Sequence, residues 1–354
     1  MKIFYVGAKY DYGRPERGFS YEYRNFYDTL IKMNGGSNEV ASFFYDEELL
    51  TRNVEEINID LIKKVEQMRP EVVFFGGGGA LDHKTAKTIT EKSGAKTLTW
   101  ISDDHWLFDK FSKHWAPFFN WVVTTDVDAL PKYNKIGYKN VILSQWAFNN
   151  FVQLPVANSE KKYEATFIGA AHGNRKKLVK KIKKEGIDIM CWGSGWPNGR
   201  VSEEEMIRIF LQSKINLNFT KSSGVIWKEF CSIFLHRNYN RKIELSNPKN
   251  WADNFRSFFP GVWSKQIKGR NFEITGFGSF FLTEYVSHLE DYYEIGKEIE
   301  CFKNIPELVE KINYYLAHDE EREKIAKAGY ERTLRDHTYE KRFNQIFKIM
   351  GLIK

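Results

Sequence analysis

A short stretch late in the chain combines side chains that could bind an anion and a sugar. Lys268 and Arg270 stand just before Glu273, and Gly276 and Gly278 follow. A helix beginning here would direct unpaired N–H groups, together with the two cations, at an anion. Glu273 could accept two ribose hydroxyls, and the glycines let backbone approach a ligand without a Cβ. These residue types fit a nucleotide-sugar site, and equally a helix–turn–strand corner with two solvated cations.

Two loops upstream have the composition of phosphate-binding turns. Gly169 follows a predicted strand and opens a turn that contains His172 and Arg175 before a basic helix. Backbone N–H groups at such a turn, beside a basic side chain, suit a phosphate. A dinucleotide or ATP site would use similar parts. A second candidate loop, after a later predicted strand, contains Lys221 and Ser223.

The first half of the chain has its own chemical cluster at the end of a predicted strand. Asp103, Asp104 and His105 are consecutive there. Adjacent carboxylates raise one another's pKa, so one of them could act as a general base, and the imidazole could orient a hydroxyl. A helix N-cap is the alternative, because Asp is a favoured capping residue.

A second acidic pair, Asp126 and Asp128, has the spacing of a D-x-D metal motif. We interpret it structurally, with Asp126 ending a strand and Asp128 capping the helix that follows. No metal site is therefore predicted. The four glycines at 76–79 lack the order of a dinucleotide fingerprint, so a tight turn and contact with a ligand both fit them.

The elements that must position these residues alternate between strands and helices. Strands are predicted at 3–6, 40–45, 72–75, 97–101, 121–124, 141–143, 164–168, 187–192 and 215–219. Helices are predicted near the end of the chain at 302–316, 320–334 and 339–349. The alternation is typical of parallel α/β sheets, whose ligands bind at the carboxyl ends of the strands.

Length and composition indicate a two-domain globular protein. The 354 residues are many for one core, and a polar break near Pro155 indicates a linker. We expect domains over 1–155 and 156–336, followed by a last helix over 337–354. The three cysteines share no short spacing, which argues against a disulfide framework or a zinc site. Neither a signal-peptide pattern nor a membrane-spanning apolar run is found, so we expect a cytoplasmic protein without a transmembrane segment.

From residue 265 to residue 339 the chain resembles the donor half of GT-B glycosyltransferases, most closely the spore-maturation (CgeB-like) group of the group 1 glycosyltransferases. The matching features are the R-x-F-E-x-x-x-x-G turn from Arg270 to Gly278, the following F-L-T-E-Y, residues 296–299, 306–316 and 321–326 with Gly329, and His337-Thr338-Tyr339. Upstream, residues 167–169 and 215–219 match the same group.

The resemblance implies a fold and an activity. GT-B enzymes have two Rossmann-like domains with parallel sheets facing across a cleft, and a C-terminal helix that crosses back to the first domain. The second domain holds a nucleotide-sugar donor such as a UDP-sugar, and the first holds the acceptor. The resemblance implies no cofactor and no metal, with Arg175, Lys268 and Arg270 neutralising the diphosphate. It places the nucleobase near Gly193, where Trp192 or Trp196 could stack on the base, and core packing fits each indole equally.

One departure leaves the stereochemistry open. Retaining members have two glutamates eight positions apart; Glu273 matches the second, but Lys265 stands in place of the first. An inverting route with Asp103 or Asp104 as base is equally consistent. A sugar-nucleotide epimerase of the same fold and a non-catalytic nucleotide- or polyanion-binding protein are the two rival functions.

The acceptor is the least specified partner. A glycan, a protein or a small molecule bound by the first domain is the leading expectation. Residues 225–270 hold nine Lys and Arg but only three Asp and Glu, interleaved with aromatic residues. This mixture suits a polyanion, such as nucleic acid, an anionic glycan or a lipid-linked phosphate. The aromatic residues fit a domain core as well.

Overall fold

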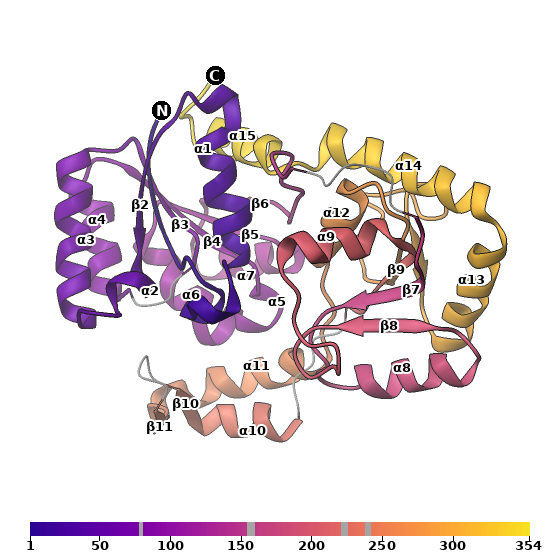
Figure 1. Ribbon diagram of the computed structural model, residues 1–354. Helices are drawn as coiled ribbons and strands as arrows, with labels where there is room; N and C mark the ends of the chain where they lie inside the picture. The colour runs from indigo at the N-terminus through magenta and orange to yellow at the C-terminus, as the bar shows by residue number, and fades with distance from the viewer. Residues whose placement is uncertain (78–80, 154–159, 221–225, 238–241) are drawn as a thin grey trace. The chain divides into compact units, whose positions relative to one another are not determined.

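The computed structural model describes residues 1–77, 81–153, 160–220, 226–237 and 242–354 (Figure 1). The chain forms two compact units. The first comprises residues 1–145, 226–261 and 339–354, and the second comprises residues 146–225 and 262–338. This division differs from the expected boundaries, because residues 226–261 group with the first sheet rather than with the second.

The first unit is built on a parallel sheet with the strand order β2-β1-β3-β4-β5-β6. Its strands are β1 (Lys2–Gly7), β2 (Glu39–Phe44), β3 (Val72–Phe75), β4 (Lys96–Ile101), β5 (Trp121–Thr124) and β6 (Val141–Leu143). All six lie where the sequence predicts strands. The order reverses direction between β1 and β3, and such a switch point is where open α/β sheets bind ligands.

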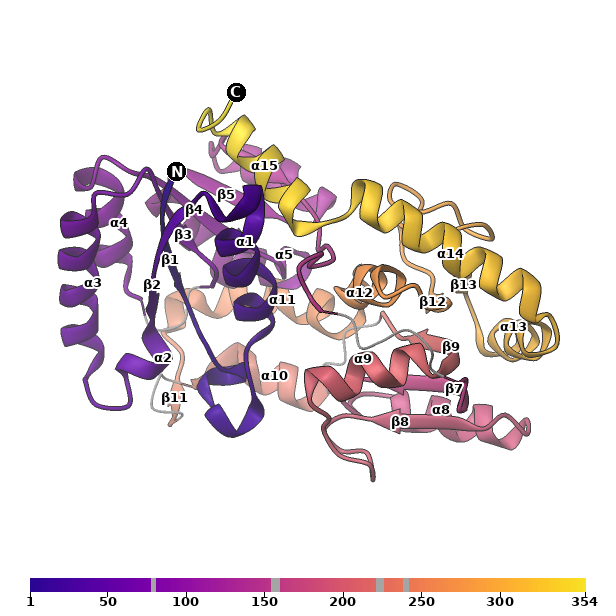
Figure 2. The ribbon, with the colours of Figure 1, turned by 45° about the horizontal axis from the view of Figure 1, so that its top comes forward.

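Helices cover both faces of this sheet (Figure 2). Those that follow the strands are α1 (Asp28–Gly36), α2 (Tyr45–Glu48), α3 (Val54–Met68), α4 (His83–Lys92), α5 (Asp104–Leu107), α6 (Lys113–Trp115) and α7 (Leu130–Lys135). Apolar residues of α3 and α4 pack against Phe4 and Phe75 on one face. On the other face Phe74 contacts the rings of Phe26 and Phe343.

Phe343 belongs to the last helix, α15 (Tyr339–Ile349), which the structure places on the first unit. The side chain of Glu340 accepts a hydrogen bond from the backbone N–H of Asn34 at 3.0 Å. Lys96 donates to the carbonyl of Met350, just beyond the helix. The apolar positions of α15 are therefore buried against elements from the other end of the chain.

Residues 226–261 of the first unit form a helix–hairpin–helix segment. Its elements are α10 (Ile226–Phe234), the antiparallel strands β10 (Leu235–Arg237) and β11 (Ile243–Leu245), and α11 (Trp251–Trp263). Lys113 Nζ lies 2.7 Å from the Asp253 carboxylate, and His114 Nε2 lies 3.3 Å from it. These contacts attach the segment to α6, and explain why it groups with the first sheet.

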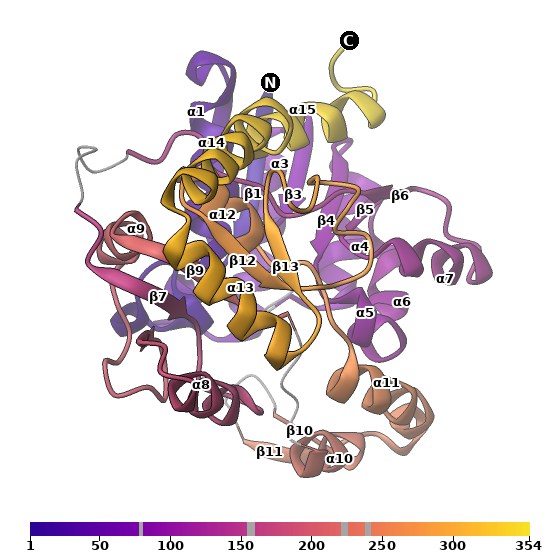
Figure 3. The same ribbon diagram turned by 90° about the vertical axis from the view of Figure 1, so that its right-hand side faces the viewer.

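The second unit has a parallel sheet with the order β13-β12-β9-β7-β8 (Figure 3). The strands are β7 (Tyr163–Ile168), β8 (Ile189–Trp192), β9 (Ser213–Asn218), β12 (Phe281–Glu284) and β13 (Glu300–Phe302). Its helices are α8 (Arg175–Lys184), α9 (Glu203–Leu211), α12 (Arg270–Gly276), α13 (Ile305–Ala317) and α14 (Asp319–Asp336).

Two cores enclose the second sheet, with α8, α13 and α14 on one face and α9 and α12 on the other. The helix predicted from Phe302 begins only at Ile305, because the Asn304 side chain caps it and Phe302 ends β13. The switch point of this sheet lies between β7 and β9. In the part of the chain that the structure describes, no helix combines the length and apolarity that a membrane crossing needs.

Candidate functional site

Arg175 links the two strands at the switch point of the second sheet. Its Nη1 donates to the carbonyl of Ala170 at 3.0 Å, and its Nη2 donates to that of Phe219 at 3.1 Å. Ala170 follows β7 and Phe219 follows β9, so one guanidinium ties both carboxyl ends together. Burial lowers the pKa of Arg175 to about 10, and the nearby Glu284 opposes this effect. The cation is thus held at the predicted turn, and its contact with a diphosphate stays a prediction.

The predicted phosphate turn and the 268–278 stretch come together here. His172 is exposed as a residue, yet its Nε2 lies 3.4 Å from Arg175 Nη1. Partial burial of the ring, with the positive charges of Arg175 and Lys268, lowers the pKa of His172 to about 4. The electrostatic effect of Lys268 on this ring shows that both segments contribute to one positive region. The imidazole is neutral at pH 7 and adds no charge.

Arg270 and Glu273 form an ion pair within α12. The guanidinium of Arg270 donates to Oε2 of Glu273, which is 5% exposed. The same guanidinium lies over the ring of Phe210 at 5.6 Å. The carboxylate predicted to accept ribose hydroxyls therefore accepts a guanidinium here. A diphosphate bound at Arg270 would compete with Glu273 for it.

Glu284 is a functional candidate that the sequence analysis did not single out. Its Oε2 accepts hydrogen bonds from the backbone N–H and the hydroxyl of Thr220, at 3.1 and 3.2 Å. Its Oε1 lies 2.9 Å from Lys265 Nζ. Lys265, which replaces the expected glutamate, thus has an ion-pair partner at the end of β12. The available signal was the position of Glu284 at the end of an apolar strand.

The predicted donor-site glycines have packing roles. A Cβ on Gly193, whose φ is +125°, would lie 2.4 Å from the carbonyl oxygen of Gly169. A Cβ on Gly276 would lie 2.3 Å from the ring of Phe148, so the close approach there is to a side chain rather than to a ligand. Gly278 has a φ of +73°, which a turn after α12 requires.

Of the two tryptophans predicted to stack on a base, Trp192 lies in the core. Trp192 is 8% exposed and contacts the ring of Tyr163 edge-on at 5.3 Å. A buried indole has no free face for a nucleobase, which corrects the stacking interpretation. The half-buried Trp196 donates from Nε1 to the carbonyl of Gly169 at 2.8 Å. Lys221 and Ser223 lie outside the described residues.

In the first unit, the cluster at the end of β4 separates into buried and accessible groups. Asp104 is completely buried and accepts the hydroxyl of Tyr133 at 2.9 Å. Burial raises its pKa to about 6, although neighbouring hydroxyls oppose this. A carboxyl without exposure cannot reach an acceptor, which argues against Asp104 as the base. Asp103, the N-cap residue of α5, and His105 are half-buried and stay candidates.

Glu22 is a further carboxyl in the first unit that the sequence did not reveal. It is half-buried and immediately precedes the short π-helix η3 (Tyr23–Tyr27). Burial raises the pKa of Glu22 to about 7, and the negative charge of Asp103 adds to this effect. A carboxyl that titrates near neutral pH suits a general base.

Tyr5 occupies the switch point of the first sheet. The side chain is completely buried, and burial raises its pKa well above the ordinary value. A Cβ on Gly76 would lie 2.3 Å from its hydroxyl oxygen, and a Cβ on Gly7 would lie 2.8 Å away. The hydroxyl has no hydrogen-bond partner among the described residues. Gly78 and Gly79 lie outside the described residues.

The D-x-D pair serves as a cap. The side chain of Asp126 accepts the backbone N–H of Asp128 at 3.1 Å, at the start of the 3-10 helix η6 (Val127–Ala129). The capping residue is therefore Asp126, whereas the sequence interpretation assigned the cap to Asp128. Within the described ranges, no group of three or more His, Cys, Asp or Glu residues is arranged to hold a metal ion.

Comparisons with known proteins agree with this architecture. Residues 175–348 match a family described as glycosyl transferase-like. Spore protein CgeB of Bacillus subtilis (strain 168) is 21% identical over 288 residues, which cover 79% of this chain and 82% of that protein. Sucrose-phosphate synthase from Thermosynechococcus elongatus aligns with a TM-score of 0.63 at 9% identity, over 99% of each chain. HepE from Anabaena, solved in complex with UDP and glucose, aligns with a TM-score of 0.59 at 9% identity, over 100% of each chain.

The chain has the GT-B fold, and its residues 175–348 match the glycosyl transferase-like family. The resemblance, the fold and the transferase class predicted from the sequence are thereby confirmed. The matched region begins at Arg175, the residue that joins the two strands at the second switch point. It also contains the Arg270–Glu273 ion pair.

Proposed function

We propose that this GT-B protein transfers a sugar from a nucleotide-sugar donor, held by the second unit, to a hydroxyl of an acceptor held by the first. The observation that carries the proposal is the positive region at the β7/β9 switch point. Arg175 is fixed there by two carbonyls, and Lys268 lies close enough to lower the pKa of His172. Permanent positive charge at this position suits the diphosphate of the donor.

The proposed donor is a UDP-sugar, and the proposed chemistry needs no metal. The HepE complex with UDP and glucose supports the choice of uridine diphosphate. Arg175, Lys268 and Arg270 would supply the charge that stabilises the leaving diphosphate. Glu273 would accept ribose hydroxyls after its Arg270 partner has turned to the phosphate.

The proposed acceptor base is in the first unit. Glu22 and Asp103 interact electrostatically, and the pKa of Glu22 near 7 lets this carboxyl accept a proton at neutral pH. Lys265 pairs with Glu284 where retaining members have a glutamate. These observations favour an inverting reaction that uses a base on the acceptor side.

Calorimetry of two ligands tests the donor site. Glu273→Gln should weaken UDP binding by about ten- to hundredfold, because a charge-assisted hydrogen bond contributes about 1.5–3 kcal/mol. Pyrophosphate has no ribose, and its affinity should not fall, because the substitution releases Arg270 from its carboxylate partner. Glu205→Gln is the matched control, because it breaks an Arg–Glu pair of the same spacing on the exposed face of α9.

Each outcome has a defined consequence. Unchanged UDP affinity in a folded Glu273→Gln variant would remove Glu273 from the site. Failure of UDP and UDP-sugars to bind or stabilise the parent protein would overturn the proposal as a whole. Conversion of the donor sugar without any acceptor would identify an epimerase. Donor binding without release of nucleotide in the presence of diverse acceptors would indicate a non-catalytic binding protein.

A further inference from the structure

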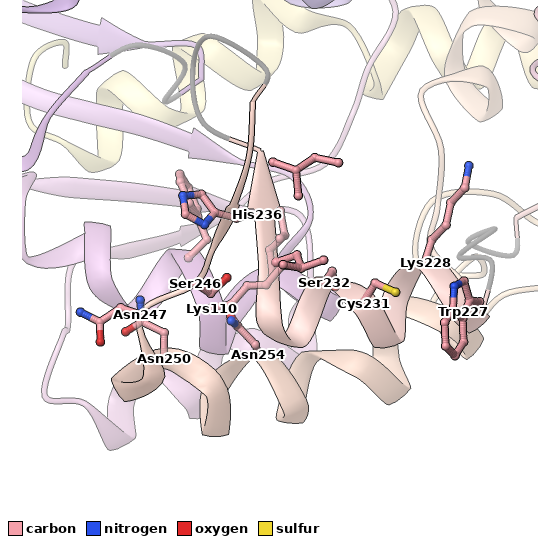
Figure 4. A pocket seen from close by; sticks show the side chains of 14 residues that line it. Lys110, Trp227, Lys228, Cys231, Ser232, His236, Ser246, Asn247, Asn250 and Asn254 are labelled. Atoms are coloured by element: carbon pink, nitrogen blue, oxygen red, sulfur yellow. The ribbon is translucent and has the colours of Figure 1, made fainter.

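A large cavity in the first unit lies outside the groups that the proposed reaction uses. Its volume is about 1190 Å³. One wall comes from α5 and the following π-helix η4 (Phe108–Ser112), and the other comes from α10, the β10–β11 hairpin and α11 (Figure 4). Ligand sites typically measure roughly 300–1,000 Å³, so this cavity has room for a molecule larger than one sugar.

The lining includes polar side chains, but most of the cavity surface is apolar, and several of its apolar side chains are exposed. Leu107 and Phe111 line one wall, and Trp227, Leu235 and Ile243 line the other. Trp227 is 71% exposed and Ile243 is 64% exposed. An exposed apolar surface of this kind on a folded protein marks a place where another apolar group is bound.

The apolar surface continues beyond the cavity as a row of aromatic rings. Trp227 stacks near Phe230 at 5.9 Å, and Phe230 meets Phe258 edge-on at 6.3 Å. Phe258 in turn contacts Phe259, which is 52% exposed. The row links α10 to α11. An elongated apolar surface fits an extended hydrocarbon chain better than a compact ring.

The charges around the cavity favour an anion. Lys110, Lys228 and His236 are among the described lining residues, none of which is acidic. Burial lowers the pKa of Lys110 and the nearby Glu229 opposes this, while His236 lies 3.7 Å from Glu244. Residues 226–261 contain six Lys and Arg against three Asp and Glu, a net charge of +3. Asp253, one of those three acids, is paired with Lys113.

We infer that this cavity binds the hydrocarbon chain of an anionic amphiphile, and that this amphiphile is the sugar acceptor. The second clause rests on the proposed glycosyl transfer. Its structural support is the position of α5, which begins at Asp104, three positions after β4 ends at Ile101. Leu107, in the cavity wall, is one helical turn further along. A chain held against Leu107 therefore lies about one helical turn from the carboxyl end of β4.

Direct binding to the full-length protein tests the inference without any sugar chemistry. The probe is dodecyl phosphate below its critical micelle concentration, titrated by calorimetry. Butyl phosphate has the same head group and a short chain, and should bind at least about a hundredfold more weakly, because each buried methylene contributes about 0.8 kcal/mol. Dodecyl maltoside has the chain without the charge, and should bind about fivefold more weakly or worse, because charge-assisted contacts are lost.

Matched variants locate the site. Trp227→Ala and the cavity-filling Ser232→Phe should each weaken dodecyl phosphate binding by about tenfold or more. Phe255→Ala is the control for Trp227→Ala, because Phe255 is 52% exposed on α11 and does not line the cavity. Lys228→Glu should likewise weaken binding, whereas Lys63→Glu, at an exposed position on α3, which does not line the cavity, should not.

Three results would overturn the inference. The first is that dodecyl phosphate does not bind. The second is that it binds equally to the parent, Trp227→Ala and Ser232→Phe proteins. The third is that the parent protein is a dimer that covers this face and that the variants are monomers, so that the apolar surface is a dimer interface. UDP titrations keep the two proposals apart. All variants should bind UDP like the parent; a parent that binds dodecyl phosphate but not UDP would refute the glycosyl transfer and the acceptor role, while leaving the lipid site in place.

Discussion

The two sheets of this protein share the same reversal of strand order, yet they place different groups at it. At the β7/β9 reversal, the cation Arg175 bonds two backbone carbonyls. At the β1/β3 reversal, the neutral Tyr5 fills the space between Gly7 and Gly76. The side chain at one reversal is therefore a permanent cation, and the side chain at the other is a neutral phenol.

The carboxyl groups of the two units also differ in their electrostatic environment. Glu273 and Glu284 of the second unit are paired with Arg270 and Lys265. In the first unit, burial raises the pKa of Glu22 to about 7 and that of Asp104 to about 6. The second unit thus has carboxylates paired with fixed cations, and the first has carboxyls that gain or lose a proton near neutral pH.

The largest expected effect comes from removing the cation of the second reversal. Arg175→Ala leaves the carbonyls of Ala170 and Phe219 without their donor, and each unpaired buried group costs about 1–3 kcal/mol. We expect a loss of about 4 kcal/mol in the free energy of unfolding, measured by urea denaturation of the full chain. Lys176→Ala, at the exposed neighbouring position, is the control and should change little. Equal stability of the two variants would show that Arg175 does not hold the strands.

The next effect is a pH dependence in the first unit. The pKa of Asp104 is about 6 in the folded protein, against an ordinary value of 3.8. This shift corresponds to a difference of about 3 kcal/mol in the free energy of ionising the carboxyl. Because the folded pKa is raised, protonation of Asp104 favours the folded state. This contribution to the free energy of unfolding is complete below about pH 4 and is lost as the pH rises through 6. Asp104→Asn should match the parent near pH 4 and exceed its stability at pH 8 by up to about 3 kcal/mol.

Urea denaturation of both proteins across this pH range measures the difference. Asp128→Asn, at an exposed position in the same unit, is the control and should give a flat difference. A flat difference for Asp104→Asn as well would mean that the carboxyl is ionised in the folded state. Asp104 would then resemble the paired carboxylates of the second unit, and the contrast between the units would weaken.

The sequence predicted most of the sheet strands because each is a short apolar or alternating run next to turn residues. It did not assign the helix–hairpin–helix segment to an architecture. All three residues of β11 are exposed, so the segment lacks the apolar–polar alternation by which a strand is recognised. Its place on the first unit depends on Lys113 and Asp253, which are 140 positions apart in the sequence. No local pattern reports such a contact.

Residues of the candidate site were likewise predicted where the signal is local in the sequence and missed where it depends on distant contacts. Arg175, Lys268, Arg270 and Glu273 were found because cations, acids and glycines stand close together in the sequence. Glu284 was missed because its partners, Thr220 and Lys265, come from other elements. Asp104 and Trp192 were assigned contacts with ligands because a residue type alone does not tell whether the side chain is buried.

A smaller effect tests the packing of the first reversal. Gly76→Ala places a Cβ 2.3 Å from the Tyr5 hydroxyl oxygen, and overpacking of this kind costs about 1–3 kcal/mol. We expect a loss of about 2 kcal/mol in the free energy of unfolding. Thermal and urea unfolding measure it. No change would mean that the Tyr5 ring has room to move, in which case the glycine is not needed for packing.

The smallest effect isolates the Tyr5 hydroxyl itself. This group is buried and lacks a hydrogen-bond partner among the described residues, so the folded state bears its desolvation cost. Tyr5→Phe should therefore raise the free energy of unfolding by up to about 1 kcal/mol. It should also recover part of the stability lost in Gly76→Ala, because it removes the hydroxyl oxygen, which is the atom nearest to the new Cβ. A double-mutant cycle over Tyr5→Phe and Gly76→Ala measures this coupling. Strict additivity would show that the hydroxyl is not what Gly76 makes room for, and a loss of stability in Tyr5→Phe alone would show that the hydroxyl has a stabilising partner, as Arg175 has at the other reversal.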